Sequence, residues 1–396
     1  MPGDAVHADL EQNRYHLGPI RLFPFLQVDN AGYNNNVFGT ADNKVGDATA
    51  DISGGARLLV PAGSKVFLRG LAAPEYIWYH RLEEGREFGG NYEAQLLGLF
   101  NHLRFDAAGR YSRTSSLLNS ETLRTVLSRT RTARGGAEID VAGPVSLFGE
   151  GEAAEYRFTA SPKPPQPLED PAILDRREDQ VRGGVRIHAA EETSFSLAAE
   201  VVRTRFDDPV QGGDNRSEAA LLGVRIDRPR WYVNVSGGYR ESRPIDASRF
   251  RDLNTATGSY FASFLVKSSI EIFVVGFRGA EYSVTTDNPY YVATTNGGGV
   301  NLQFSPRFSV RLYGDYAENA YPVPSAAEGG IRRKDTIGTF GGGFQLALGR
   351  RLGLGVFGTE YRYDSNVPGV ARDIFRVTAG ISFQVSPIVS IRGGLS

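Results

Sequence analysis

The sequence lacks several features that whole classes of protein require. It contains no cysteine, which excludes disulfide frameworks, thiolate metal sites and cysteine nucleophiles. It contains no run of 18 apolar residues, so a membrane-spanning helix is excluded. The 44 basic and 45 acidic residues leave a net charge of −1, and no overall positive field is present to attract nucleic acid.

Lysine, methionine and tryptophan are scarce, with 5, 1 and 2 residues respectively. Glycine (47), tyrosine (18) and phenylalanine (23) are abundant instead. This composition favours twisted, close-packed β structure over helices. The first residues, "MPGDAVHADLEQNRYHLGP", have no basic stretch and no apolar core, so they do not have the pattern of a signal peptide.

Apolar and polar residues alternate along most of the chain. In "FNHLRFDAAGRYSRT" (residues 100–114), Leu103, Phe105 and Tyr111 fall on one parity. Arg104, Asp106 and Arg110 fall on the other. Because successive side chains of a strand point to opposite faces, this pattern predicts a strand with one apolar and one polar face. The same alternation recurs in "TARGGAEIDV", "QVRGGVRIH", "WYVNVSGGYR", "RFSVRLYGDY" and "IFRVTAGISFQV".

Short and long connections alternate between these strands. The short ones include "VAGPVS" and "DRPRW", and the long ones include 36–47, 160–177 and 318–333. Counting in this way gives about nineteen strands, with no change of composition that would mark a second folded domain. We therefore predict an all-β fold, a transmembrane antiparallel β-barrel of about 18–20 strands. Residues 1–18 form an N-terminal periplasmic segment in this prediction, and residues 19–396 form the barrel.

A soluble β-sandwich also has two-faced strands, so the two architectures must be distinguished. A sandwich fills its apolar face with large interdigitating side chains, whereas here that face mixes large residues with many Gly and Ala. Its aromatic residues gather near strand ends, such as Tyr76 and Trp78 at one end and Trp231 and Phe308 at the other. Aromatic girdles at both ends of an apolar band are typical of a barrel in the outer membrane, in contact with its lipid and lipopolysaccharide.

The polar parity then faces the lumen, since an arginine on the lipid face costs ~2–4 kcal/mol at midplane. A barrel of this size encloses a channel or needs a plug. The lumen-lining residues predicted in this way are Arg69, Arg104, Asp106, Arg110, Arg134, Glu138, Asp140, Glu150, Glu152, Arg182, Arg186, Arg225, Arg311, Asp315 and Arg376. Glu150 and Glu152 are more readily explained by pairing with Arg134 or Arg182 than as glycosidase acids or a cation site. This mixed lining indicates a polar channel for hydrophilic or anionic solutes. It is equally consistent with a lattice of salt bridges that stiffens the wall.

The first strand resembles a known family. "FPFLQVDNAGYNNNVFG" (residues 23–39), followed by "ADISGGARLLVPAG", is similar to the opening of the outer-membrane β-barrel porins of Gram-negative bacteria whose genes often lie beside exopolysaccharide genes. The resemblance implies an integral outer-membrane barrel, but it assigns neither a transported substrate nor a functional residue. Such barrels usually end in Phe or Trp, whereas this chain ends "SPIVSIRGGLS". This ending predicts a further strand, which either pairs in parallel with the first strand or is followed by one or two strands that the sequence lacks. We favour the second alternative, in which the final strand is lacking, because bacterial barrels normally have an even strand count.

Two loops are candidates for controlling the lumen. "SLLNSETLRTVLSRT" (116–130) has leucines and a valine at near-helical spacing, which predicts either a short helix folded inward or an ordinary surface loop. "SPKPPQPLEDPAILDRRED" (161–179) is rich in proline and is expected to be extended and external. The glycine runs 296–301 and 340–345 lie within strand patterns, which indicates close strand approach and not phosphate binding.

No catalytic motif, cofactor motif or metal motif is found, so no enzyme, cofactor or metal is predicted. The favoured function is a porin for hydrophilic solutes or polysaccharide export. The alternative is a structural barrel that holds a periplasmic, lipoprotein or electron-carrier partner. A third hypothesis, an outer-membrane hydrolase, would depend on His80, which is placed near the rim.

Overall fold

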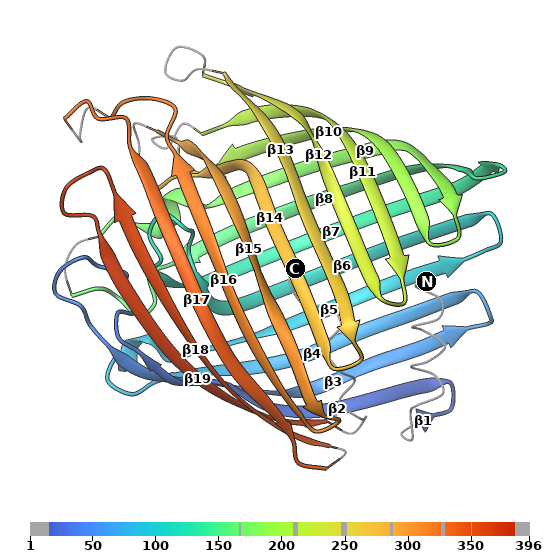
Figure 1. Cartoon of the computed structure of the whole chain (residues 1–396), viewed down its shortest axis with the longest axis horizontal. Helices are drawn as coiled ribbons and strands as arrows, with labels where there is room; N and C mark the ends of the chain where they lie inside the picture. Colours follow the sequence, from blue (N-terminus) through green and yellow to red (C-terminus); the bar gives the residue numbers. More distant parts are fainter. Residues whose placement is uncertain are drawn as a thin grey trace.

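The structure, a computed structural model, describes residues 16–165, 168–208, 213–246, 252–285, 288–325, 329–349 and 351–384. Almost all of these residues are in strands or in the connections between strands (Figure 1). Two short 3₁₀ helices, η1 (Glu83–Gly85) and η2 (Pro171–Leu174), interrupt the connections. Across the described ranges, no helix has the length and apolar character needed to cross a membrane.

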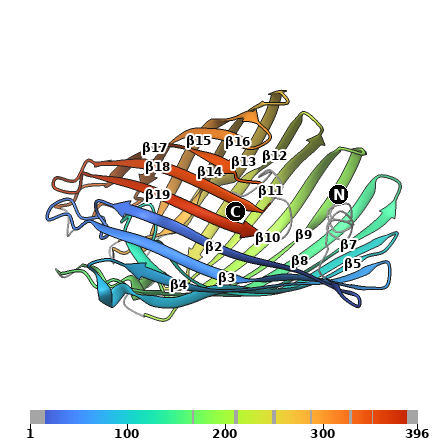
Figure 2. The ribbon, with the colours of Figure 1, turned by 90° about the horizontal axis from the view of Figure 1, so that it is seen from below.

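The strands follow one another around a single wall (Figures 1 and 2). Their bounds are β1 His16–Leu17, β2 Ile20–Asn34, β3 Asp47–Ala62, β4 Val66–Tyr79, β5 Glu87–Leu99, β6 Leu103–Leu117, β7 Thr125–Ala142, β8 Val145–Thr159, β9 Arg176–Ala190, β10 Thr193–Phe206, β11 Asn215–Arg228, β12 Trp231–Pro244, β13 Leu253–Lys267, β14 Ile270–Tyr282, β15 Tyr290–Ser305, β16 Phe308–Ala320, β17 Lys334–Ala347, β18 Leu352–Ser365 and β19 Arg372–Gln384. Each strand from β2 to β19 pairs in antiparallel register with the next along the chain. The two-residue β1 pairs with β2.

The wall closes between β19 and β2, which are also antiparallel. The result is a closed barrel of 18 strands, which confirms the predicted fold class and strand range. The strand that we expected at residues 386–396 lies outside the described residues, as does most of the expected N-terminal segment. Within the described residues, an even ring is already complete with β19.

Close approach of two strands shapes the point of closure. A Cβ atom on Gly32 would collide with the carbonyl oxygen of Val377 on β19, so that only glycine fits. The register of β2 against β3 shifts between Asp29 and Gly32, and Asn30 in the shift has a φ of 50°. Asparagine tolerates this left-handed conformation better than most residues do. The same reasoning explains the run at 340–345, where a Cβ on Gly343 would meet the Val356 carbonyl.

The outer face of the barrel is apolar and exposed, as the alternating pattern predicted. Large side chains on this face remain uncovered, such as Val181 at 66%, Leu222 at 66% and Tyr239 at 58% exposed. A soluble protein does not leave an apolar surface of this extent in water. Backbone polar groups are paired around the closed ring, which is the condition for strands to lie in lipid. The outer face is therefore a lipid-facing surface.

The two ends of the barrel differ in the length of their connections. At one end the turns are short, for example 143–144 and 229–230. At the other end the loops are longer, for example 35–46, 160–175 and 321–333. Outer-membrane barrels have short periplasmic turns and longer extracellular loops. This rule assigns the short-turn end to the periplasm and the long-loop end to the outside.

Placing a charge on the lipid-facing surface tests this assignment of faces. Leu222→Arg should lower the free energy of unfolding by ~2–4 kcal/mol, because the guanidinium would lie in hydrocarbon. Ser236→Arg is the matched control, since Ser236 of the neighbouring strand β12 lies on the opposite face of the wall from Leu222. Its hydroxyl lies 3.3 Å from that of Ser259. Urea unfolding in lipid vesicles measures both variants. Equal losses for the two variants would contradict the assignment.

Candidate constriction and charged lumen

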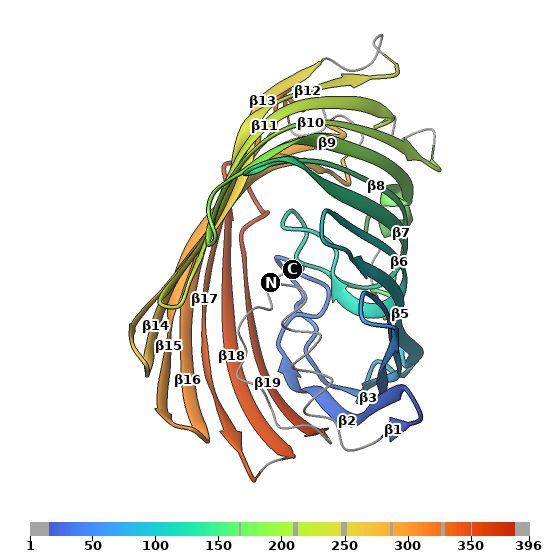
Figure 3. The same ribbon diagram turned by 90° about the vertical axis from the view of Figure 1, so that its right-hand side faces the viewer.

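The loop between β6 and β7, residues 118–124, crosses the interior of the barrel. Asn119 donates a side-chain hydrogen bond to the Tyr282 carbonyl on β14 at 3.2 Å. The Ser120 hydroxyl contacts the Tyr291 hydroxyl on β15 at 3.1 Å and bonds the Asn319 amide oxygen on β16 at 3.2 Å. In a ring of 18 strands, β15 lies on the opposite side from β6 (Figure 3). The loop therefore reaches across the lumen to the opposite wall.

The conformation of this loop corrects one of our two sequence predictions. Leu117 ends β6 and Val126 belongs to β7, so the near-helical spacing arises from a strand, a turn and a second strand. No helix forms there, because neighbouring strands satisfy the backbone groups on both sides of the turn. The inward position does agree with one of the alternatives that the sequence left open.

A buried charged network fastens the loop to the opposite wall. Glu121, at the loop tip, is 2% exposed. Its carboxylate accepts hydrogen bonds from the Ser283 hydroxyl at 3.0 Å and from the Val284 N–H at 2.9 Å. It also lies 3.4 Å from the Arg333 guanidinium. Arg372 donates to the backbone oxygen of Glu121. The loop tip is thus held from the β14–β15 loop, the β16–β17 loop and β19.

Arg333 connects this loop to a second carboxylate. Its Nε lies 3.0 Å from the Asp335 carboxylate, and one of its terminal nitrogens donates to the Tyr363 hydroxyl at 3.0 Å. The Arg333 guanidinium also lies 4.9 Å from the centre of the Tyr321 ring. Burial raises the pKa of Glu121, while Arg333 and the Val284 N–H act in the opposite direction. A buried carboxylate with these partners is costly to leave unpaired, which makes the network a strong fastening.

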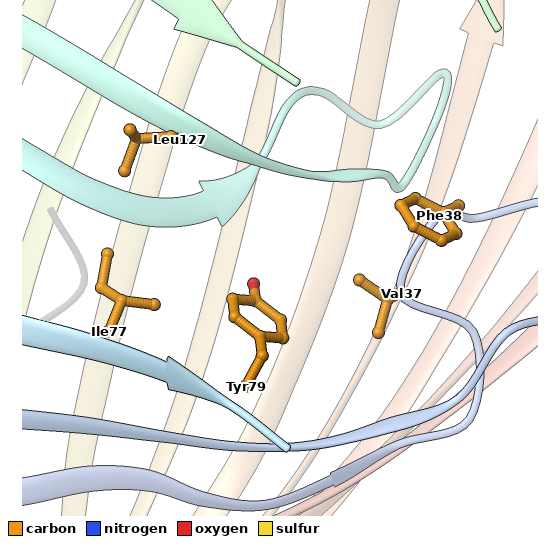
Figure 4. Packing of buried hydrophobic residues seen from close by; sticks show 5 residues of the cluster. All are labelled: Val37, Phe38, Ile77, Tyr79 and Leu127. Carbon is orange, nitrogen blue, oxygen red and sulfur yellow. The ribbon is translucent and has the colours of Figure 1, made fainter. Parts of the chain in front are cut away.

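Apolar contacts complete the attachment of the loop. Leu123 is 5% exposed and packs in a cluster with Ala317, Ile337, Tyr363 and Ile374, which come from β16 to β19. The first residues of β7 contribute to a second packed cluster. Figure 4 shows its Leu127 with Val37 and Phe38 of the 35–46 loop and with Ile77 and Tyr79 of β4. The long-loop half of the barrel is therefore narrowed by packed side chains.

The segment 161–179 also contributes to this packing, although we expected it to be extended and external. Leu174 of η2 is 2% exposed and packs with Phe206, Val284 and Leu118. Arg124 donates to the Glu169 carbonyl at 2.9 Å, so the segment contacts the inward loop. The proline-rich composition indicated irregular backbone but could not reveal the apolar residues of "PAIL" as an anchor. Residues 166 and 167 of this segment lie outside the described residues.

Register places the fifteen residues predicted from alternation on one and the same face of the wall. The loop identifies that face, because Phe158 of β8 and Leu118 of the loop pack against the same buried cluster, and Phe158 shares its parity with Glu150 and Glu152. Residues that are directly opposite one another on paired strands share a face. Arg134 is opposite Glu152, and Arg182 is opposite Glu150, so both arginines lie on this face. By the same reasoning the inner face holds Arg69, Arg104, Asp106, Arg110, Glu138, Asp140, Arg186, Arg225, Arg311, Asp315 and Arg376. Their role in contact with a solute stays a prediction.

Some of these residues pair with one another. Arg104 lies 3.4 Å from Asp140, Arg182 lies 3.6 Å from Glu150, and Arg225 lies 3.3 Å from Asp227. Arg186 forms an ion pair with Glu138, which also accepts a hydrogen bond from Ser146 at 2.7 Å. The expected pairing of Glu150 with an arginine is observed with Arg182. Arg225 and Asp227 both belong to β11, whereas the other pairs link side chains of neighbouring or next-but-one strands from β6 to β9.

Two arginines on this face, Arg110 and Arg134, form no ion pair with a carboxylate of the residues that the structure describes. In register, Arg110 is opposite Glu93 of β5, and Arg134 is opposite Glu152 of β8. Among the described residues, however, no carboxylate lies within 4.0 Å of either guanidinium, and both arginine side chains are exposed. Their donors are therefore not taken up by a carboxylate. Arg110 and Arg134 are thus exposed charges of this lining without a carboxylate partner among the described residues.

Sequence reasoning missed an acidic patch on the inner face of β2 to β4. Asp51 is directly opposite Asp29, and Glu75 is opposite Ser53, two residues from Asp51. Asn30 donates to Asp51 at 2.6 Å. The alternation of "FPFLQVDN" contained the signal for Asp29, but only register brings the three carboxyl groups together. Within the described ranges, no cluster of three or more His, Asp or Glu residues is arranged to hold a metal ion.

His80 lies at the long-loop end, directly after β4, as expected. Its ring is 5.8 Å from that of Trp78, and its carbonyl accepts a hydrogen bond from Arg86 at 3.2 Å. These two contacts, with Trp78 and Arg86, fix the position of His80 at the rim.

Comparison with known proteins identifies the fold. No protein-family model matches the chain, and no curated protein matches its sequence. OccAB3 of Acinetobacter baumannii superposes with a TM-score of 0.54 at 10% identity, covering 93% of this chain and 100% of that one. A BenF-like porin from Pseudomonas fluorescens Pf-5 gives 0.53 at 10% identity, with coverage of 93% and 99%. OccK2 (OpdF) of Pseudomonas aeruginosa, solved in complex with glucuronate, gives 0.52 at 12% identity, with coverage of 93% and 99%.

At these identities the similarity shows the fold, which is that of the outer-membrane porins. The barrel expected from the sequence and from the resemblance of residues 23–39 is thereby confirmed. An association with exopolysaccharide is not shown by these structures, and polysaccharide export receives no support from them.

Proposed function

We propose that this chain is an outer-membrane porin that passes small hydrophilic solutes through its lumen, with a preference for anionic ones. The observation that carries this proposal is an 18-strand wall with exposed arginines on its inner face and an inward loop that narrows the lumen. Barrels of 16–18 strands enclose an aqueous channel, so the inner charges face water. A loop fixed across such a channel limits the size of the solute.

The preference for anions is supported by Arg110 and Arg134, whose guanidinium groups are exposed and form no ion pair with a carboxylate among the described residues. One of the structures with this fold, OccK2, was solved in complex with glucuronate, a small hydrophilic anion. Small sugar acids are therefore the first solutes to test. No observation favours a barrel that holds a partner in its lumen.

Planar-bilayer recording of the purified barrel tests this function. We expect discrete conductance steps, and a reversal potential in a KCl gradient that shows preferential passage of chloride. Liposome swelling should be faster with glucuronate than with a cationic solute of similar size. A folded barrel that stays closed at both polarities, together with liposomes that do not swell, would overturn the proposal.

A further inference from the structure

A group of arginines lies on the outer face of β9, β10 and β11, beside the lipid-facing surface. On β10 the outward side chains include Leu197, Val201, Arg203 and Arg205, in this order toward the long-loop end. The intervening Thr204 is completely buried on the inner side, where its hydroxyl meets that of Tyr282 at 2.7 Å. Arg203 therefore follows the apolar band after a single outward step. Between Val201 and Arg203, the outward side chains of β10 therefore change from apolar to positively charged.

Register places like charges directly opposite one another here. Arg177 of β9 is opposite Arg205, and Arg203 is opposite Arg216 of β11. Directly opposite residues have Cβ atoms about 4.5–5.5 Å apart, and like charges at that spacing destabilise the pair of strands. Two such pairs on three neighbouring strands are unfavourable unless an anion lies between them.

The protein itself compensates these charges only in part. Arg216 lies 2.9 Å from Glu218. Asp179 is opposite Arg203 in register, yet within the part of the chain that the structure describes no carboxylate lies within 4.0 Å of the guanidinium of Arg177, Arg203 or Arg205. All three side chains are exposed. We call Arg177, Arg203 and Arg205 the arginine triad.

The opposite end of the same strands has a different arrangement. There the outward arginine of β11, Arg228, lies 3.5 Å from Glu192 and 5.4 Å from the centre of the Trp231 ring. Arg228 thus has a carboxylate partner and an aromatic partner, as expected for a residue in an interfacial girdle. On the outer face of these three strands, the uncompensated arginines of the described residues lie at the long-loop end, where the chain meets the outer leaflet.

We propose that the arginine triad binds the phosphate groups of a phosphorylated glycolipid in the outer leaflet. Guanidinium groups form bidentate, charge-assisted hydrogen bonds with phosphate, and two from adjacent strands can hold one phosphate group. The acyl chains of such a lipid would lie along Val201, Leu197 and their neighbours, directly beneath its headgroup. A free phosphate ion would gain the charge contacts but not this apolar contact.

Binding of a bis-phosphorylated glycolipid to the detergent-purified full-length barrel tests the proposal. The variant Arg177→Gln/Arg203→Gln/Arg205→Gln should bind it at least about tenfold more weakly, since each basic residue near an anionic lipid surface contributes about 1 kcal/mol. Replacing the three arginines by lysine should restore part of the affinity. Arg228→Gln is the matched control and should bind as the unmodified barrel does. A heat-dependent shift in electrophoretic mobility verifies that each variant is folded.

Removing the phosphates from the glycolipid should abolish the difference between the triple variant and the unmodified barrel. Equal binding of the phosphorylated lipid by both proteins would overturn the proposal. Displacement of the lipid by an equal concentration of inorganic phosphate would also overturn it, because the triad would then be a phosphate site without lipid specificity. The measurement does not depend on conductance, so its outcome is separate from that of the proposed transport function.

Discussion

Glu121→Ala should release the loop between β6 and β7 and raise the conductance of the barrel. The variant removes the carboxylate that accepts from Ser283 and Val284 and faces Arg333. Breaking a buried charge pair by removing one partner costs about 3–5 kcal/mol. The wall is closed by backbone pairing from β2 to β19, so this cost should fall on the docked loop and not on the barrel. A loss of this size changes the ratio of docked to undocked loop by about 10²–10⁴.

Single-channel recording measures the result as larger and more variable steps, and liposome swelling should admit larger solutes. Glu121→Gln keeps the shape of the side chain and part of its hydrogen bonding, so it should give an intermediate change. Glu84→Ala is the matched control, because Glu84 is an exposed carboxylate on another loop of the same end. If the folded Glu121→Ala barrel conducted like the unmodified one, the loop would not be what narrows the lumen.

Arg110→Glu/Arg134→Glu should turn the ion preference of the barrel from anions toward cations. Each substitution replaces an exposed inner-face arginine that forms no ion pair among the described residues, so the lining loses two positive charges and gains two negative ones. A unit charge acts on an ion 4 Å away with about 1 kcal/mol in water and about 4 kcal/mol near a protein surface. The permeability ratio of chloride to potassium should therefore fall severalfold or more, and the effect should weaken at high salt.

The reversal potential in a KCl gradient measures this change. The control exchanges an existing pair, Arg104→Asp with Asp140→Arg, which leaves the total charge of the lumen unchanged. That exchange should leave the reversal potential close to its original value. An unchanged reversal potential in the Arg110/Arg134 variant would show that these arginines do not face the conducting path.

The wall of this protein could be predicted from the sequence because the information for it is local. Side chains alternate with period two in any strand, and lipid tolerates only apolar groups on the outer parity. The segment 100–114 therefore specifies by itself that Arg104, Asp106 and Arg110 face inward. The order of short and long connections is also readable along the chain, and together these patterns determined the fold class and the inner-face residues.

The sequence could not show which charges form ion pairs or what fills the lumen. Arg104 and Arg110 have the same parity on the same strand, yet Asp140 of β7 forms an ion pair with the first. Glu93 is opposite the second in register without coming within 4.0 Å of its guanidinium. The near-helical spacing at 116–130 was also misleading. The segment contains the end of β6 and the start of β7, and the spacing of its residues does not reveal that both strands extend into it.

The fastening of the loop depends on even longer separations. Glu121 and Arg333 are 212 residues apart in the chain, and nothing near either residue identifies the other as its partner. They meet because the ring closes around one lumen, and the loop at residues 118–124 spans that lumen to reach residues between β14 and β19. The arginine triad likewise arises from register across β9 and β10 and from no motif in either strand. Alternation in the sequence thus predicted which side chains of a strand share a face, whereas closure of the barrel decided which residues meet across it.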